Sequence, residues 1–93
     1  MMTKALAVEL AATGVTVNAI APGFVRTKFS SVLWQTPQIH DKVLEAIPAK
    51  RMADPQEIAG IAAFLASDEA AFTTGSVFEV DGGQLAASGV RIG

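Results

Sequence analysis

The stretch that decides the fold is Gly14–Thr27, which reads GVTVNAIAPGFVRT. From Val15 to Ala21, valine or alanine stands at every second position, and the β-branched residues gather at the front. This alternation predicts a short, mostly buried strand. Pro22 and Gly23 end it, because proline supplies no N–H to a strand ladder and glycine favours a turn or a close backbone approach.

A helix precedes this strand. Met2, Leu6 and Leu10 recur at four-residue spacing among good helix formers, and Gly14 marks the end of the helix. Only Thr3 is available as an N-cap, and the periodicity is already running at Met2. We therefore expect the chain to begin inside a helix, and a helix followed by a strand is half of a parallel α/β unit.

A less regular stretch and a well-marked helix follow. Residues 24–53 predict an excursion with one or two short helices, one of them around Gln38–Ala46. Asp54 is then placed as an N-cap, with Pro55 at the first helical position and Glu57 able to accept a hydrogen bond from the cap's backbone N–H. Apolar residues at helical spacing extend this helix to about Ala66: they are Ile58, Ile61, Ala62 and Leu65.

The last predicted strand is Ser76–Val80, and Asp81-Gly82-Gly83 predicts a sharp turn after it. The tail from Gln84 to Gly93 has small residues, with Leu85, Val90 and Ile92 as its anchors. Strand, crossover helix and strand form a βαβ unit, which we expect to be right-handed. Two strands cannot make a stable buried parallel sheet, because both faces and both edges of such a sheet need covering, so further strands are expected upstream.

Composition excludes several classes of protein. Of 93 residues, 51 % are hydrophobic and 17 % are charged, with a mean hydropathy of +0.40, which excludes disorder. A net charge of −2 without a basic run argues against nucleic acid or an anionic membrane as partner, and no apolar run is long enough to span a bilayer. The absence of cysteine excludes a disulfide scaffold and a thiolate metal site, and fits a reducing, cytoplasmic location.

The candidate ligand site is the loop Pro22–Thr27, since ligands of open α/β sheets bind beyond the carboxyl ends of the strands. Gly23 lets a planar ring or amide approach, Pro22 fixes the turn, Val25 offers its backbone N–H and C=O, and Thr27 adds a hydroxyl. Such a loop suits a carboxamide or a phosphate. A plain strand-ending turn, with Thr27 capping the next short helix, fits the spacing equally well.

Other polar residues carry weaker hypotheses. Asn18 in mid-strand is expected to tie neighbouring loops together, because a buried amide must be satisfied. His40 has no triad partner and no second metal ligand, so it is expected at the surface, and no metal site is predicted. Arg51 and Asp54 are expected to form a solvated pair.

Apolar residues of the excursion include aromatic ones that either line a pocket under a lid or belong to ordinary packing. They are Phe24, Phe29, Val32, Leu33 and Trp34. The chain has no tyrosine, no glycine-rich phosphate loop and no acid, base or nucleophile with an evident partner, so no catalytic residue is assigned. That argues against an autonomous enzyme.

Several landmarks in order resemble the C-terminal portion of classical short-chain dehydrogenases/reductases, over essentially the whole chain. They are LAVEL at 6–10, GVTVNAIAPGFVRT at 14–27, Ile47-Pro48, Arg51, PQEIA at 55–59, FLASDEAA at 64–71, Thr74-Gly75 and VDGG at 80–83. Each motif alone is weak, but their order and spacing are specific.

The resemblance implies the C-terminal part of one Rossmann-like, doubly wound parallel sheet that binds NAD or NADP, with residues 24–53 as the substrate lid. It implies hydride transfer between nicotinamide and a carbonyl or alcohol substrate. Pro22, Gly23 and Val25 would neighbour the cofactor, with Thr27 reaching its carboxamide. Phe24, Phe29 and Trp34 would be lid residues near the substrate. The terminal strand and the turn at 81–83 would form a homodimer or homotetramer interface.

The resemblance also implies what these residues lack. The family's glycine-rich loop, catalytic Ser and Tyr-x-x-x-Lys pair would all lie before Met1, and Lys4 does not match the catalytic Lys. We therefore expect Met1 or Met2 to be internal to a longer protein and this chain to be inactive alone. The alternative is a non-catalytic interaction module that uses the terminal strand, and a third is complementation by a partner chain that supplies the missing loop and Tyr.

Overall fold

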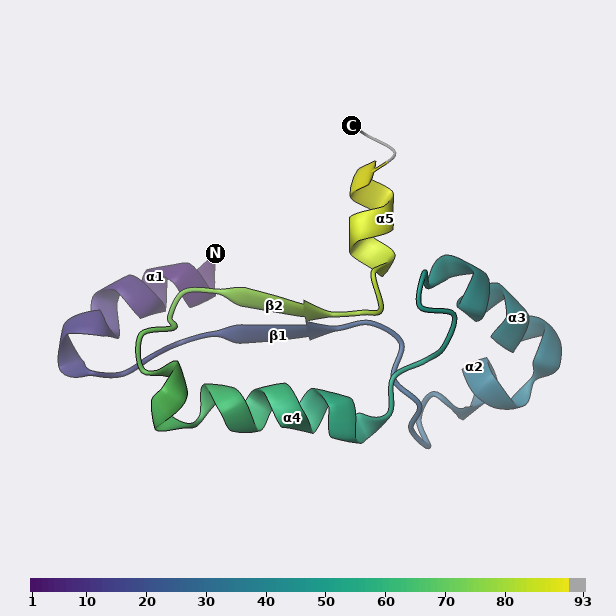
Figure 1. Ribbon diagram of the computed structural model, residues 1–93, viewed down its shortest axis with the longest axis horizontal. Coiled ribbons are helices and arrows are strands. Elements are labelled where there is room, and N and C mark those ends of the chain that lie inside the picture. Colours follow the sequence, from purple (N-terminus) through teal and green to yellow (C-terminus); the bar gives the residue numbers. More distant parts are fainter. Residues whose placement is uncertain (91–93) are drawn as a thin grey trace.

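The computed structural model describes residues 1–90, arranged as helices around a small parallel sheet (Figure 1). The elements in order are α1 Met2–Leu10, the 3₁₀ turn η1 Ala11–Thr13, β1 Ala19–Pro22, α2 Ser31–Gln35, α3 Pro37–Ala46, α4 Pro55–Leu65, the 3₁₀ turn η2 Asp68–Ala70, β2 Val77–Val80 and α5 Gln84–Val90. This is the predicted α/β order. Ile92, expected to anchor the tail, lies outside the described residues.

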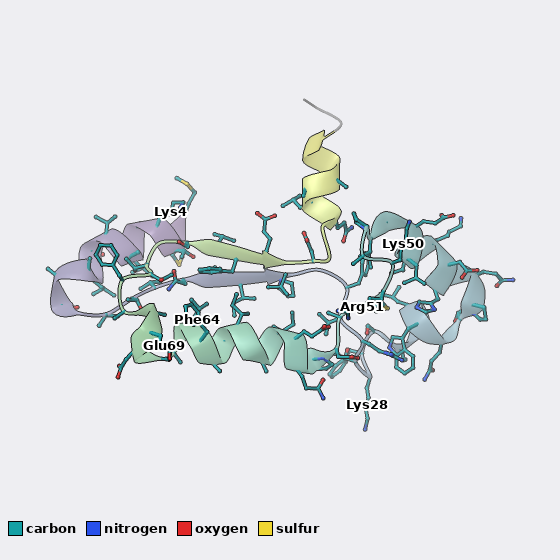
Figure 2. All side chains as sticks on the ribbon, in the orientation of Figure 1. Lys4, Lys28, Lys50, Arg51, Phe64 and Glu69 are labelled. Carbon is teal, nitrogen blue, oxygen red and sulfur yellow. The ribbon has the colours of Figure 1, made fainter. Side chains whose placement is uncertain are left out.

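The predicted N-terminal helix is confirmed as α1, and Gly14 ends its 3₁₀ extension in the left-handed conformation at φ 86°. Within α1 only Ala7 is buried, and Met2 and Leu6 stay exposed. The helix is held near the start of β2, where Lys4 Nζ donates to the Gly75 carbonyl at 2.8 Å, and Figure 2 shows Lys4 at that place. The helix therefore contacts the rest of the chain through Ala7 and Lys4, and its large apolar side chains Met2 and Leu6 are left exposed.

The two strands pair in parallel with a register of Ala19 to Val77 and Pro22 to Val80. The predicted strand Val15–Ala21 was wrong at both ends, because pairing starts at Ala19 and includes Pro22. Ala19 N and Gly23 N both donate to this partner strand, so the two-residue alternation turns the Pro22 nitrogen away from it. The proline therefore costs the ladder no hydrogen bond.

The crossover helix α4 runs along one face of the sheet, as Figure 1 shows. The prediction of Pro55–Ala66 is confirmed to within one residue, and Asp54 N donates to Glu57 Oε2 at 2.9 Å, as the cap motif predicts. The apolar stripe of α4 is half-buried; its large members are Ile58, Ile61 and Leu65. The other face of the sheet carries Val77, which is half exposed, and Glu79.

Asn18 ties the amino ends of the strands together, as predicted. Its Nδ2 donates to the Thr73 carbonyl at 3.0 Å, and its Oδ1 accepts from Ser76 N at 3.1 Å. Val17 N donates to Thr74 Oγ1 at 3.0 Å beside it. The Asn18 side chain thus supplies the hydrogen bonds between the two segments just before the backbone pairing of β1 with β2 begins.

The excursion at residues 24–53 holds two short helices, as expected, and forms its own small core beyond the carboxyl ends of the strands (Figure 1). Val43, Ile47 and Met52 are buried there, with Phe24, Leu33 and Trp34 packed against them. A parallel bridge between Val25 and Ala53 joins its two ends. This core lies apart from the sheet and leaves the chain elongated: the radius of gyration is 16.0 Å, against about 12 Å for a compact chain of this length.

The tail, predicted without an element, forms α5, which stands out from the strand ends on the side away from α4 (Figure 1). The helix starts immediately after the predicted turn, where Gly82 and Gly83 have φ values of 66° and 94°. The Asp81 carboxylate accepts hydrogen bonds from Gly83 N and Leu85 N. An aspartate just before a helix can accept hydrogen bonds from the first free backbone amides of that helix. Asp81 was therefore the sequence signal for α5.

Candidate functional site

The carboxyl ends of β1 and β2 lie side by side, and the loops that leave them enclose two hollows. One, of about 120 Å³, is lined by Phe24, Ile47, Val80 and Asp81 among others. The second, of about 250 Å³, lies on the α5 side and is lined by residues that include Pro22, Gly23, Asp81 and Leu85. The predicted ligand loop therefore borders open space at the expected edge of the sheet.

Gly23 is required by a close approach within the protein itself. A Cβ atom at this position would lie 2.8 Å from Asp81 Cβ and 2.9 Å from Asp81 Cα, closer than real Cβ atoms come. Gly23 N also donates to the Val80 carbonyl at 3.0 Å, which prolongs the ladder by one bond. The predicted close approach is present, and its partner is the turn after β2.

Val25 presents its amide away from the bridge that fixes it. Arg26 N donates to the Ala53 carbonyl at 2.8 Å and Ala53 N donates to the Phe24 carbonyl at 2.9 Å, so the backbone on both sides of Val25 is held. The Val25 carbonyl accepts from Ser30 Oγ at 2.6 Å. Within residues 1–90, no acceptor contacts the Val25 N–H, which leaves a fixed donor at the strand end.

Thr27 is engaged with Ser30 at the start of α2. Thr27 N donates to Ser30 Oγ at 2.9 Å, and Ser30 N donates to Thr27 Oγ1 at 3.2 Å. The reciprocal pair orders the loop and satisfies a backbone N–H next to the helix start. The N-cap of α2 is Ser30 and no side chain caps that helix, so the prediction that Thr27 caps it was wrong. Thr27 instead orders the turn that leads into the helix.

The three aromatic lid candidates lie in different surroundings. Trp34 is half-buried, its Nε1 donates to the Thr27 carbonyl at 3.0 Å, and the Arg26 guanidinium lies 5.3 Å from its ring centroid. Phe24 packs against the lid core and borders the smaller hollow. Phe29 is 103 % exposed and belongs neither to the lid core nor to the lining of the smaller hollow.

The predicted Arg51–Asp54 pair was wrong, because Arg51 instead forms a two-pronged ion pair with Glu57. Arg51 Nη2 lies 2.6 Å from Glu57 Oε1 and Nη1 lies 2.9 Å from Oε2. The hydrogen bonds from Arg51 and from the Asp54 backbone N–H lower the pKa of Glu57 from 4.5 to about 2, and Glu57 raises the pKa of Arg51. Asp54 lies 3.9 Å from Arg26 Nε, and Figure 2 shows Arg51 between the strand ends and the lid.

Comparison with known proteins identifies the family. A family model described as enoyl-(acyl carrier protein) reductase matches residues 1–84. Dehydrogenase/reductase SDR family member 4 from Bos taurus is 45 % identical over 84 residues, which are 90 % of this chain and 30 % of that protein. The chain belongs to the short-chain dehydrogenase/reductase family.

Further relatives agree with this short-chain dehydrogenase/reductase assignment. Oxidoreductase UcpA from Escherichia coli K12 is 46 % identical over 98 aligned residues, covering 99 % of this chain and 37 % of that protein. A crystal structure of a 2-deoxy-d-gluconate 3-dehydrogenase candidate from Agrobacterium tumefaciens with bound NADP superposes with a TM-score of 0.86 at 45 % identity, covering 91 % of this chain and 35 % of that one. The predicted Rossmann-like fold is confirmed, and the chain spans about a third of the length of these relatives.

Two residues that shape the candidate site were not predicted from the sequence. Ser30 orders the loop through Val25 and Thr27, and Asp81 contacts Gly23. The Thr-x-x-Ser spacing of 27 and 30 and the Asp-Gly-Gly turn were the available signals. Among the described residues, no group of His, Asp and Glu could hold a metal ion, and no helix combines the length and apolar character needed to cross a bilayer.

Proposed function

We propose that residues 1–93 form part of one NAD(P)-binding domain of an oxidoreductase, with the loop Pro22–Thr27 against the nicotinamide end of the cofactor. The observation that carries this proposal is the Val25 N–H, which is fixed by the flanking bridge and meets no acceptor within residues 1–90. It lies at the carboxyl edge of a parallel sheet, where α/β folds bind ligands.

The loop fits a planar amide group in part. The Val25 N–H is an available donor for a carboxamide oxygen, and Gly23 and Pro22 border the hollow on the α5 side without a long side chain. The Val25 carbonyl is already bonded to Ser30 Oγ. The Thr27 hydroxyl accepts from Ser30 N and donates weakly at 3.3 Å to Ser30 Oγ, so its proton can turn toward a stronger acceptor.

We place residues 24–53 as the substrate lid, with Trp34 and Phe24 as its ordering aromatics. Trp34 holds the strand-end loop through its bond to the Thr27 carbonyl, and Phe24 links the lid core to the sheet. Phe29 is fully exposed, so a role for it in substrate contact requires the lid to move. The substrate class proposed is a small carbonyl or alcohol compound.

A bound nicotinamide would supply or accept the hydride, and the residues described here would only position it. We propose that this chain has no turnover alone, because a short-chain dehydrogenase/reductase of the resembled type uses a tyrosine as proton donor and these 93 residues contain none. Mixing the purified chain with NADH or NADPH and a panel of ketones should give no oxidation above buffer. Turnover would contradict this proposal.

Cofactor binding is tested with Val25→Pro, which removes the N–H, against Val25→Ala, which keeps it. The bridge to Ala53 uses the backbone of Phe24 and Arg26, so both variants should retain it. Titration with NADH or NADPH, followed by nucleotide fluorescence, should give weak saturable binding to the wild type and to Val25→Ala and none to Val25→Pro. Equal binding by all three would contradict the role of this N–H.

A second candidate function is a non-catalytic module for self-association, as a homodimer or homotetramer. Exposed apolar side chains on β2 and α5 favour it, since Val77 is 50 % and Leu85 56 % exposed. Size-exclusion chromatography of wild type and Leu85→Ser should show a discrete oligomer that the substitution dissociates. A monomer or a polydisperse aggregate would argue against this function.

A cytoplasmic location stays a prediction.

A further inference from the structure

Asp81 lies where three segments of the chain meet: the end of β2, the loop after β1 and the end of the lid. Its two carboxylate oxygens accept from different amides, Oδ1 from Gly83 N at 2.9 Å and Oδ2 from Leu85 N at 3.1 Å. Its carbonyl also accepts from Gln84 N at 3.3 Å. Side chain and backbone are therefore both fixed by the start of α5.

The loop after β1 rests directly on this residue. The space that a Gly23 side chain would need is filled by Asp81 Cβ and Cα, at 2.8 and 2.9 Å from the Cβ position. Gly23 N is bonded to the neighbouring Val80 carbonyl at 3.0 Å. A shift of Asp81 must therefore move or loosen the backbone at Gly23, since nothing flexible separates the two.

The lid rests on the next residue along the turn. The Gly82 carbonyl accepts from Ala49 N at 3.0 Å, and a Cβ at Gly82 would lie 2.7 Å from Ile47 Cγ2. Ile47 is 2 % exposed and belongs to the lid core. Gly82 has a φ of 66°, a conformation that favours glycine, and the next amide, Gly83 N, is bonded to Asp81 Oδ1. The end of the lid therefore rests on a turn whose backbone Asp81 holds.

We propose that Asp81 is a positioning residue, which fixes the loop Pro22–Thr27 and the end of the lid relative to one another through the turn at 81–83. The proposal rests on the proposed function, because that loop is assigned to the cofactor there. The Asp81 carboxylate acts through the two amides from which it accepts, Gly83 N in the turn and Leu85 N in α5. It fixes the turn backbone that Gly23 and Ala49 contact, and it also bonds to the start of α5. The loop after β1, the end of the lid and α5 are therefore joined through this turn.

The test measures amide hydrogen exchange by NMR in the wild-type chain, Asp81→Ala, Asp81→Asn and Asp68→Asn. Asp68 is an exposed acid in η2 whose carboxylate has no hydrogen-bond partner within residues 1–90, which makes it the matched control. In Asp81→Ala, exchange at Ala49 and Gly23 should accelerate about fivefold to tenfold, as expected for loss of a capping acceptor. Asp81→Asn keeps one acceptor oxygen and should give a smaller increase, and Asp68→Asn none.

A merely structural role would loosen the whole sheet, so the amide of Ser76, bonded to Asn18 at the far end of the strands, is the internal reference. Equal acceleration at Ser76 and Ala49, or no change at Ala49 and Gly23, would overturn the proposal. Should Asp81→Ala fail to fold, the comparison of Asp81→Asn with Asp68→Asn decides by the same ratio of Ala49 to Ser76 exchange.

A cofactor titration of the same four proteins separates this inference from the proposed function. Weaker NADH or NADPH binding in Asp81→Ala than in Asp68→Asn supports the positioning role, and equal binding contradicts it. A wild type that binds neither nucleotide contradicts the proposed function, and with it the cofactor part of the role. The exchange ratio would then still decide whether Asp81 couples the loop to the lid.

Discussion

The two ends of the small sheet are held together in opposite ways. At the amino ends, the Asn18 side chain bonds to Thr73 and Ser76, so a polar group fills the space between the chains. At the carboxyl ends, Gly23 lies against Asp81 and Gly82 against Ile47, so the missing side chains allow the contact. At the amino ends, side chains can rearrange around a substitution. At the carboxyl ends, an added side chain at Gly23 would meet the Asp81 backbone, which cannot move aside. The rigid end is the one that borders the candidate cofactor loop.

The largest effect is expected from adding a methyl group at the carboxyl end. Gly23→Ala places a Cβ 2.9 Å from the Asp81 backbone, which cannot rotate away, and should destabilise the fold by about 2–3 kcal/mol. Gly60→Ala is the control, because nothing lies within 4 Å of its Cβ position on α4, and it should stabilise by about 0.5–1 kcal/mol. Urea unfolding measures both. A tolerated Gly23→Ala would break the contrast.

A smaller loss is expected at the amino end. Asn18→Ala removes a donor and an acceptor that are both in use, and should cost about 1–2 kcal/mol of unfolding free energy. Asn18→Asp keeps the acceptor for Ser76 N but sets a carboxylate oxygen against the Thr73 carbonyl oxygen, where the wild type has a donor at 3.0 Å, so in urea unfolding at neutral pH it should lose at least as much as Asn18→Ala. A loss larger than that of Gly23→Ala would reverse the order of the two ends.

The ion pair beside the carboxyl ends predicts a pH dependence. The folded-state pKa of Glu57 is lowered to about 2 from an ordinary value of 4.5, so its stabilising contribution is present above about pH 4.5 and is lost as the pH falls toward 2. The group is exposed, so the effect should be modest and should weaken in high salt. Glu57→Gln, measured by urea unfolding at each pH, should lack this component. An unchanged pH profile in Glu57→Gln would contradict the assignment.

The smallest effect is expected in the lid, at Phe29. Its side chain is 103 % exposed, so Phe29→Ala should change the unfolding free energy by less than about 0.5 kcal/mol. Trp34→Ala is the contrast within the same segment, because it removes the bond to Thr27 and packing against the lid core, and should cost more. Equal losses in thermal unfolding would mean that the lid is not held by Trp34.

Elements with short-range signals could be predicted from sequence. The helix after Asp54 follows from a cap, a proline and a glutamate within one turn, and the Asn18 tie follows from a polar residue in a strand that needs partners. The pairing of Arg51 could not be predicted, because Asp54 and Glu57 are both near in sequence and only the helix geometry selects Glu57. The contact of Gly23 with Asp81 could not be predicted, because the two positions are far apart in the chain and a glycine has no side chain that would indicate its partner.

The most direct test of the proposed cofactor placement at the carboxyl ends of the strands is a map of amide chemical shifts in the 93-residue chain as NADPH or NADH is added. We predict changes at Gly23, Val25 and Thr27 and at the turn 81–83, with Thr73–Ser76 and α1 unchanged. Changes centred on the Asn18 end of the sheet, or no saturable change at Val25, would contradict the placement of the cofactor at the carboxyl ends.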